Sequence, residues 1–109
     1  MNDALLERYP RLARLFAAYL HQDWDLHGDT PYAAVRAYAR TTKATERKEA
    51  VAEIGRLLAE FPGERALDAA LGELLCGYAP SAEGVTAKAF VGRVRRVLAA
   101  PPRKAPRGR

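Results

Sequence analysis

Five segments of this chain carry apolar residues at spacings of three and four, and none keeps up the apolar and polar alternation of a half-buried strand. The observed spacing places apolar side chains on one face of an α-helix. Each such helix must bury its apolar face, and 109 residues are enough for one core. We therefore expect an all-α fold, a single compact domain of about five helices with orthogonal or bundle-like packing over residues 1–100.

Proline and threonine indicate where the expected helices begin. Pro10 suits a first helical turn, because its missing N–H would have no partner there. Thr30 before Pro31, and later Thr86, offer hydroxyls that can accept hydrogen bonds from free backbone donors, so they predict the starts of the second and fifth helices. Thr45 predicts the start of the third, since an acidic residue follows it.

The apolar stripes predict which residues form the core. The third helix is expected from about Glu46 to Glu60, and the fourth from about Glu64 to Gly77. The single cysteine, Cys76, is expected to be a small core residue with a raised thiol pKa. The predicted inward-facing residues, helix by helix, are Leu12, Leu15, Phe16 and Tyr19; Ala34, Val35, Tyr38 and Ala39; Val51, Ile54, Leu58 and Phe61; Leu67, Leu71, Leu74, Leu75 and Tyr78; and Phe90, Val91, Val94, Val97 and Leu98.

The formal net charge of +5 is concentrated at the C-terminal end of the sequence, PPRKAPRGR. Removing its four basic residues from the total of 18 leaves 14 against 13 acidic ones, so residues 1–100 are nearly neutral. Residues 101–109 are expected to form a disordered basic tail, for which a solvated segment that aids solubility is the favoured interpretation. Weak attraction to nucleic acid without sequence preference is the alternative. No apolar run reaches the roughly 20 residues of a membrane helix, and no signal peptide is recognisable, so we expect a cytoplasmic protein.

Residues 21–31, HQDWDLHGDTP, combine both histidines, the single tryptophan and three aspartates. Alternating imidazole and carboxylate groups could in principle bind a divalent ion. However, alternate positions in a short loop do not converge on one point unless the backbone is specially folded, and no recognised metal loop has this spacing. The sequence therefore does not predict a metal site from the alternating residues His21, Asp23, Asp25, His27 and Asp29.

The same segment has the residue types of a catalytic site but is better explained as a helix connection. Asp23 and Asp25 could act as an acid and base pair, yet loop aspartates more often cap helices or bond their own backbone. Trp24 is expected to anchor the loop in the core, with one partner for its indole N–H. His21 and the neighbouring carboxylates can satisfy one another, so a structural role is favoured.

Other catalytic motifs are missing from the sequence. The glycines are scattered and form no phosphate-binding loop, and one cysteine cannot supply the pairs of a structural zinc site. A nucleophilic Cys76 would need a nearby histidine and a lowered pKa. We therefore expect no catalytic residues, no metal and no cofactor.

Nucleic-acid binding is the alternative function that the residues suggest. Arg93, Arg95 and Arg96 are expected on the exposed side of the last helix, which the basic tail follows, and such a stripe suits phosphate contacts. The connections between helices, however, do not show the short turn that leads into a recognition helix.

Two stretches resemble a known family. The run YPRLARLFAAYLHQDWDLHGDTPYAAVRAYA is similar to the amino-terminal signature of bacterial contact-dependent growth inhibition immunity proteins of the CdiI type. The shared features are a tyrosine and proline start, an aromatic-rich helix, an HQDWD-like loop and a second helix with alanines and aromatics. The run LLCGYAPSAEGVTAKAFVGRVRRVL resembles the closing part of the family, a tyrosine-containing turn and a last helix of the form FLxxVRxxL.

The resemblance implies a stoichiometric antidote rather than an enzyme. Such a protein binds the toxic C-terminal domain that a neighbouring cell delivers, often a nuclease. Surface carboxylates would then face the basic, phosphate-binding cleft of that nuclease and speed association. On this reading Asp23, Asp25, His27 and Asp29 include toxin contacts. His21 and Trp24 hold the loop in place.

The anchoring role of Trp24 predicts a large loss of stability when the ring is removed. Trp24→Ala should lower the free energy of unfolding by about 3 to 5 kcal/mol, as large-to-small core changes do. Urea denaturation of the two proteins measures the difference. A loss under about 1 kcal/mol would show that the ring is not buried.

Overall fold

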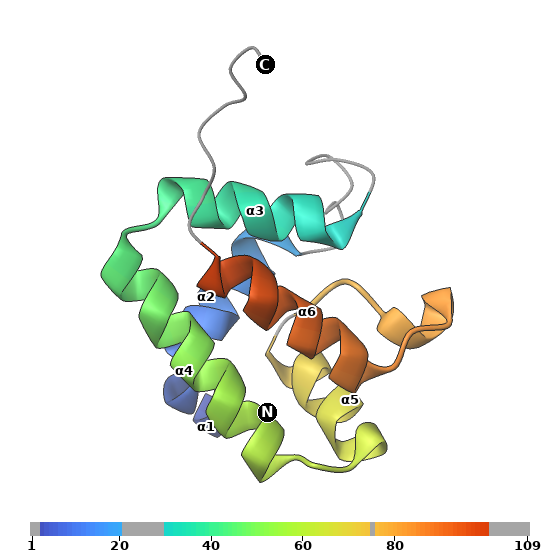
Figure 1. Ribbon diagram of the computed structural model, residues 1–109. Coiled ribbons are helices and arrows are strands. Elements are labelled where there is room, and N and C mark those ends of the chain that lie inside the picture. The colour runs from blue at the N-terminus through green and yellow to red at the C-terminus, as the bar shows by residue number, and fades with distance from the viewer. Residues whose placement is uncertain (1–2, 21–29, 75, 101–109) are drawn as a thin grey trace.

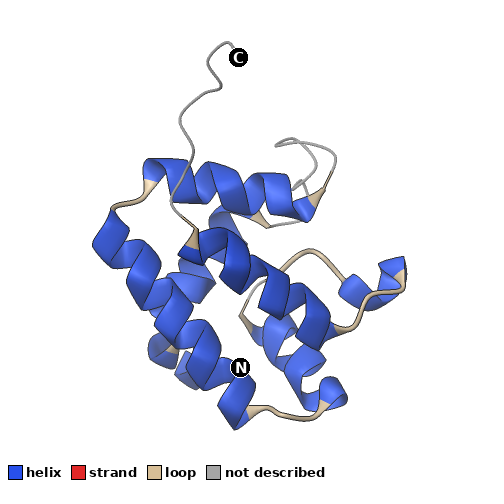
Figure 2. Ribbon diagram, viewed as in Figure 1, coloured by secondary structure: helices blue, strands red, loops and turns tan. Residues whose placement is uncertain are grey.

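The computed structural model describes residues 3–20, 30–74 and 76–100, and within these ranges all regular secondary structure is helical (Figure 2). The predicted all-α class is therefore confirmed. None of the helices in these ranges is long and apolar enough to cross a membrane. The elements are α1 (Asp3–Arg8), α2 (Pro10–Tyr19), α3 (Pro31–Thr41), α4 (Ala44–Glu60), α5 (Glu64–Glu73), the 3-10 turn η2 (Pro80–Glu83) and α6 (Ala87–Ala99).

Helix α6 is the central element of the fold. It lies between α3 and α4 and also contacts α5 and η2, while α2 packs against α3 and α4 (Figure 1). Phe90, Val91, Val94 and Leu98 of α6 are buried as predicted, and Val97 is half-buried. One continuous core therefore joins helices from both ends of the chain.

Three of the predicted helix starts are confirmed. Helix α2 begins at Pro10 and α3 at Pro31. The Thr30 hydroxyl accepts a hydrogen bond from the backbone N–H of Ala33 at 3.3 Å. The Thr86 hydroxyl accepts one from Ala89 at 3.0 Å and begins α6 in the same way.

The predicted start of α4 is wrong by one or two residues. The helix begins at Ala44 after the extended backbone of Thr42 and Lys43, so Thr45 lies inside the first turn and caps nothing. Its buried face is also turned relative to the predicted stripe, because α4 packs against α2 as well as α6. The buried residues are Ala50, Glu53, Ile54 and Leu57, whereas Val51, Leu58 and Phe61 are half-buried.

Two further boundaries differ from the sequence prediction. The short helix α1 precedes the predicted first helix and packs against α2 and α5. Helix α5 ends at Glu73 rather than near Gly77, so the buried Tyr78 belongs to a non-helical segment. Cys76 is half-buried against the core, donates its S–H to the carbonyl of Tyr78 at 3.4 Å, and has its pKa raised by burial to about 11, in the expected direction.

The carboxylate of Glu53, on α4, occupies the N-terminus of α2. Its two oxygens accept hydrogen bonds from the backbone N–H of Arg11 at 3.2 Å and of Leu12 at 3.0 Å. Pro10 has no N–H, and Ala13 bonds to the carbonyl of Tyr9, so Glu53 satisfies the free donors that remain at this helix end. Burial raises the pKa of Glu53, and the two backbone N–H groups act against that rise.

Glu64, in the first turn of α5, makes a similar contact with α6. It accepts hydrogen bonds from the backbone N–H of Ala87 and, at 3.3 Å, of Lys88. Together with the Thr86 hydroxyl, this carboxylate satisfies the donors at the start of α6. The N-terminus of each of these two helices is thus held by a glutamate from another helix, and the positive end of the helix dipole favours both contacts.

The other acidic residues of α4 also face α1 and α2. Glu60 forms an ion pair with Arg8 and accepts a hydrogen bond from the Tyr9 hydroxyl, and hydrogen bonding to Arg8 lowers the pKa of Glu60. Arg11 donates to Glu49 at 2.7 Å and lies 3.7 Å from Glu46. All four glutamates of α4 therefore lie on the side that contacts the N-terminal helices.

The capping contact predicts a specific cost for removing Glu53. Glu53→Ala leaves two backbone donors of α2 without a partner, a buried one at Leu12 and a part-buried one at Arg11, so the free energy of unfolding should fall by about 2 kcal/mol. Denaturation in urea gives this value. Glu49→Ala is the matched control on the same helix, and it should cost much less because water screens its exposed ion pair. Equal losses in the two variants would contradict the capping role.

Candidate functional site

The candidate segment identified from the sequence lies outside the described residues. It comprises His21, Asp23, Trp24, Asp25, His27 and Asp29. The structure does describe the residues on either side of it. Leu20 follows the last residue of α2, and Thr30 caps the start of α3. These attachments define where the segment leaves the core and where it returns.

Both attachments are part of the core. Leu20 is fully buried, its N–H donates to the carbonyl of Phe16 at 3.0 Å, and its carbonyl accepts from the N–H of Gly77 at 2.5 Å. At the other end Thr30 caps α3, and the next residue, Pro31, is buried. The segment therefore starts and ends at positions held by backbone hydrogen bonds and by packing.

An aromatic cluster lies beside the return point. The ring of Phe90 lies 5.9 Å from that of Tyr32 and 4.9 Å from that of Tyr78, measured between centroids. The guanidinium of Arg93 lies over the Tyr32 ring at 4.2 Å from its centroid. This cation–π contact holds an exposed arginine of α6 against the first turn of α3, next to the end of the candidate segment.

The described residues form no metal site and contain no reactive thiolate. Within residues 3–20, 30–74 and 76–100 no group of three or more histidine, cysteine, aspartate or glutamate side chains could hold a metal ion. Burial raises the pKa of Cys76, so this side chain is a thiol at neutral pH rather than a reactive thiolate. Both histidines lie outside these ranges.

Sequence reasoning missed two features that the structure brings together. Glu53 is not among the predicted core residues of α4, because a carboxylate carries no apolar signal, although it is buried against α2. Arg93 was expected to be a solvent-facing phosphate contact, and it is exposed, but its guanidinium is held on Tyr32. Neither pairing has a local signal, because the partners are 42 and 61 positions apart along the chain.

The chain is similar to known immunity proteins. The family model described as CdiI immunity protein matches residues 8–98, which run from the end of α1 nearly to the end of α6. A chain from the crystal structure of a CdiA-CT/CdiI complex from Y. kristensenii 33638 is 29% identical, with a TM-score of 0.74. That match covers 84% of this chain and 98% of the other. No curated protein matches the chain. Because the family model spans most of the sequence and all of the central helices, the chain belongs to the CdiI immunity protein family.

Proposed function

We propose that this chain is an immunity protein that binds and neutralises the C-terminal toxin domain of a contact-dependent growth inhibition system. The observation that carries the proposal is the similarity to a chain of a CdiA-CT/CdiI complex over nearly the whole of that chain. Membership of the immunity family supports the same function. The partner is therefore a cognate toxin domain, met in the cytoplasm of the cell that receives it.

Neutralisation in this proposal is stoichiometric and not enzymatic. One immunity protein covers one toxin domain, so protection depends on affinity and on the amount of immunity protein rather than on turnover. The thiol state of Cys76 is consistent with this mode of action. No cofactor is needed.

The segment between α2 and α3 is proposed as part of the toxin-binding surface. Asp23, Asp25, His27 and Asp29 would contact the toxin, and His21 and Trp24 would hold the segment. Leu20 and Thr30 support this idea, because a segment with both ends held by the core loses less conformational entropy on binding than a free one.

We further propose that the toxin is a nuclease. The cleft of a nuclease is basic because it binds phosphates, and a segment with three aspartates has the opposite charge. Such complementarity speeds the encounter of the two proteins and aligns them.

A titration tests the proposed function. The purified cognate toxin domain, encoded beside the gene for this chain, should lose its activity on RNA or DNA in proportion to added protein and reach full inhibition at a 1:1 ratio. The same pair should restore growth when both are produced in one cell. A toxin that stays active with excess protein would contradict the proposal. Growth rescue without any nuclease activity would contradict only the nuclease assignment.

The three aspartates are expected to contribute strongly to the affinity. Changing Asp23, Asp25 and Asp29 together to alanine should weaken toxin binding by at least about 30-fold, since losing charged partners at an interface costs about 2 kcal/mol or more. Calorimetry with the purified toxin domain measures this change. The matched control replaces three acidic residues of the described structure, Glu7, Asp68 and Glu83, by alanine. Unchanged affinity of the first variant, with circular dichroism showing a folded protein, would contradict the binding role.

A further inference from the structure

Acidic side chains are unevenly distributed over the helices of this fold. Helices α3 and α6 contain no acidic residue, and together they carry six basic ones. The glutamates of α4 lie toward α1 and α2, and Glu64 is bonded to the start of α6. The layer formed by α3, α6 and the outer side of α4 therefore keeps its positive charge.

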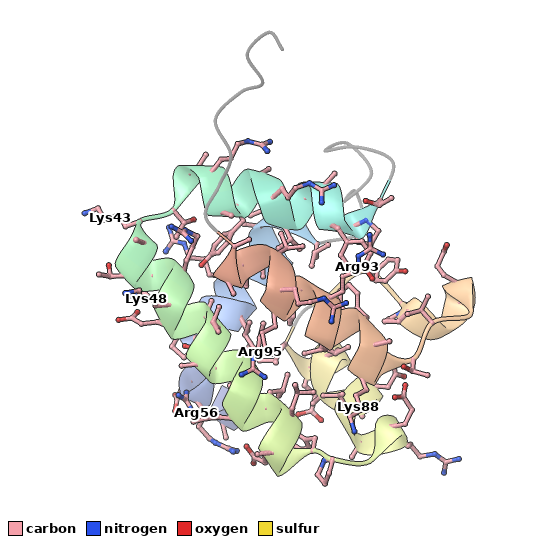
Figure 3. All side chains as sticks on the ribbon, in the orientation of Figure 1. Lys43, Lys48, Arg56, Lys88, Arg93 and Arg95 are labelled. Carbon is pink, nitrogen blue, oxygen red and sulfur yellow. The ribbon has the colours of Figure 1, made fainter. Side chains whose placement is uncertain are left out.

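We call the exposed cations at the start of α4 and on the α4 side of α6 the basic face, and its members are Lys43, Lys48, Lys88 and Arg95. Arg93 points to the other side of α6, where its guanidinium lies over the Tyr32 ring of α3. Figure 3 shows Lys48 on α4, Lys88 and Arg95 on α6, and Lys43 just before α4 at the edge of the view. None of them forms an ion pair with a carboxylate of the described residues. Their charges are thus available to a partner.

The two helices present matching ridges on this face. Lys48, Ala52, Gly55 and Ala59 of α4 follow one another at spacings of four, three and four, and Lys88, Gly92, Arg95 and Ala99 of α6 do the same. The Arg95 guanidinium lies across α4, with Nη2 3.9 Å from the point where a Cβ on Gly55 would be. Small residues between the cations let the surface of another protein approach closely.

A shallow pocket of about 210 Å³ lies at one end of the basic face, between the start of α4 and the end of α6. Arg47 lies in its wall and donates from Nη1 to the carbonyl of Leu98 at 3.3 Å. A pocket of this kind can receive one protruding side chain of a partner. The lining residues are Ala44, Arg47, Lys48, Val51, Leu98 and Ala99.

We propose that the basic face docks an acidic surface of the toxin domain, as a second contact region besides the segment between α2 and α3. This inference rests on the proposed function and extends it. Unpaired arginines and lysines next to small residues complement a carboxylate-rich protein surface. The positive field of the face would also speed the encounter with that surface.

A protein surface fits the basic face better than a nucleic acid does. A recognition helix must project to enter the major groove, whereas α6 lies between α3 and α4 (Figure 1). The rings of Tyr32, Tyr78 and Phe90 are buried and so cannot stack on bases.

Charge reversal tests this docking surface. Lys48→Glu combined with Arg95→Glu should weaken binding to the purified toxin domain by at least about tenfold. Most of the loss should come from slower association, and the association rate of this variant should depend less on salt than that of the unchanged protein. The matched control, Arg14→Glu with Arg65→Glu, makes the same charge change on α2 and α5 and should alter affinity by less than about twofold. Surface plasmon resonance at two salt concentrations measures both variants, and circular dichroism checks their fold.

The possible failures can be told apart. If the unchanged protein does not bind the toxin, both the proposed function and the docking surface are wrong. If it binds and the two double variants weaken binding equally, only the docking surface is wrong. The proposal is also overturned if the unchanged protein binds duplex DNA or RNA with a steep salt dependence that the Lys48 and Arg95 variant loses while its toxin affinity stays the same. Should Lys48→Glu with Arg95→Glu fail to fold, Lys48→Gln with Arg95→Gln replaces it.

Discussion

A carboxylate from one helix bonded to the N-terminus of another holds together parts of this chain that are distant in sequence. Glu53 joins α4 to α2, and Glu64 joins α5 to α6. The start of a helix has free N–H groups and the positive end of the helix dipole. Both stabilise a carboxylate there and offset the free-energy cost of removing its charge from water. The contact of Glu53 with the start of α2 helps to position α2 against α4. The end of α2, where the chain enters the candidate segment, is positioned along with it.

The same use of acidic residues determines the surface charge. Because the glutamates of α4 are engaged with α1 and α2, the opposite side of the α4 and α6 layer stays positive although residues 1–100 are nearly neutral overall. In the proposed complex, a nearly neutral domain would contact the toxin through two regions of opposite charge, the aspartate-containing segment and the basic face. For a protein of the CdiI immunity family, two such surfaces would both orient a toxin partner and favour its own over others.

Much of the fold could be predicted because its signals are local. Apolar periodicity and the Thr-Pro start identified the central helices, and Thr30, Thr86 and Pro10 begin helices as expected. Thr45 misled the prediction, since a threonine followed by a glutamate also fits inside a first turn. The candidate site was predicted only from the residue types in one segment of the sequence and from a family resemblance. Its neighbours Arg93 and Tyr32, 61 positions apart, could be paired only in space.

The sequence by itself determined the helical class, the approximate limits of most helices, the family and the place of HQDWDLHGDTP between two helices. These depend on spacing, caps and motifs, all of which act over a few residues. Only the tertiary structure decided that Glu53 is buried, that the glutamates of α4 lie on the side toward α1 and α2, and that Lys48 and Arg95 lie on adjacent ridges of α4 and α6. The reason is that burial and charge neighbours are set by packing between helices, which joins residues with no relation along the chain.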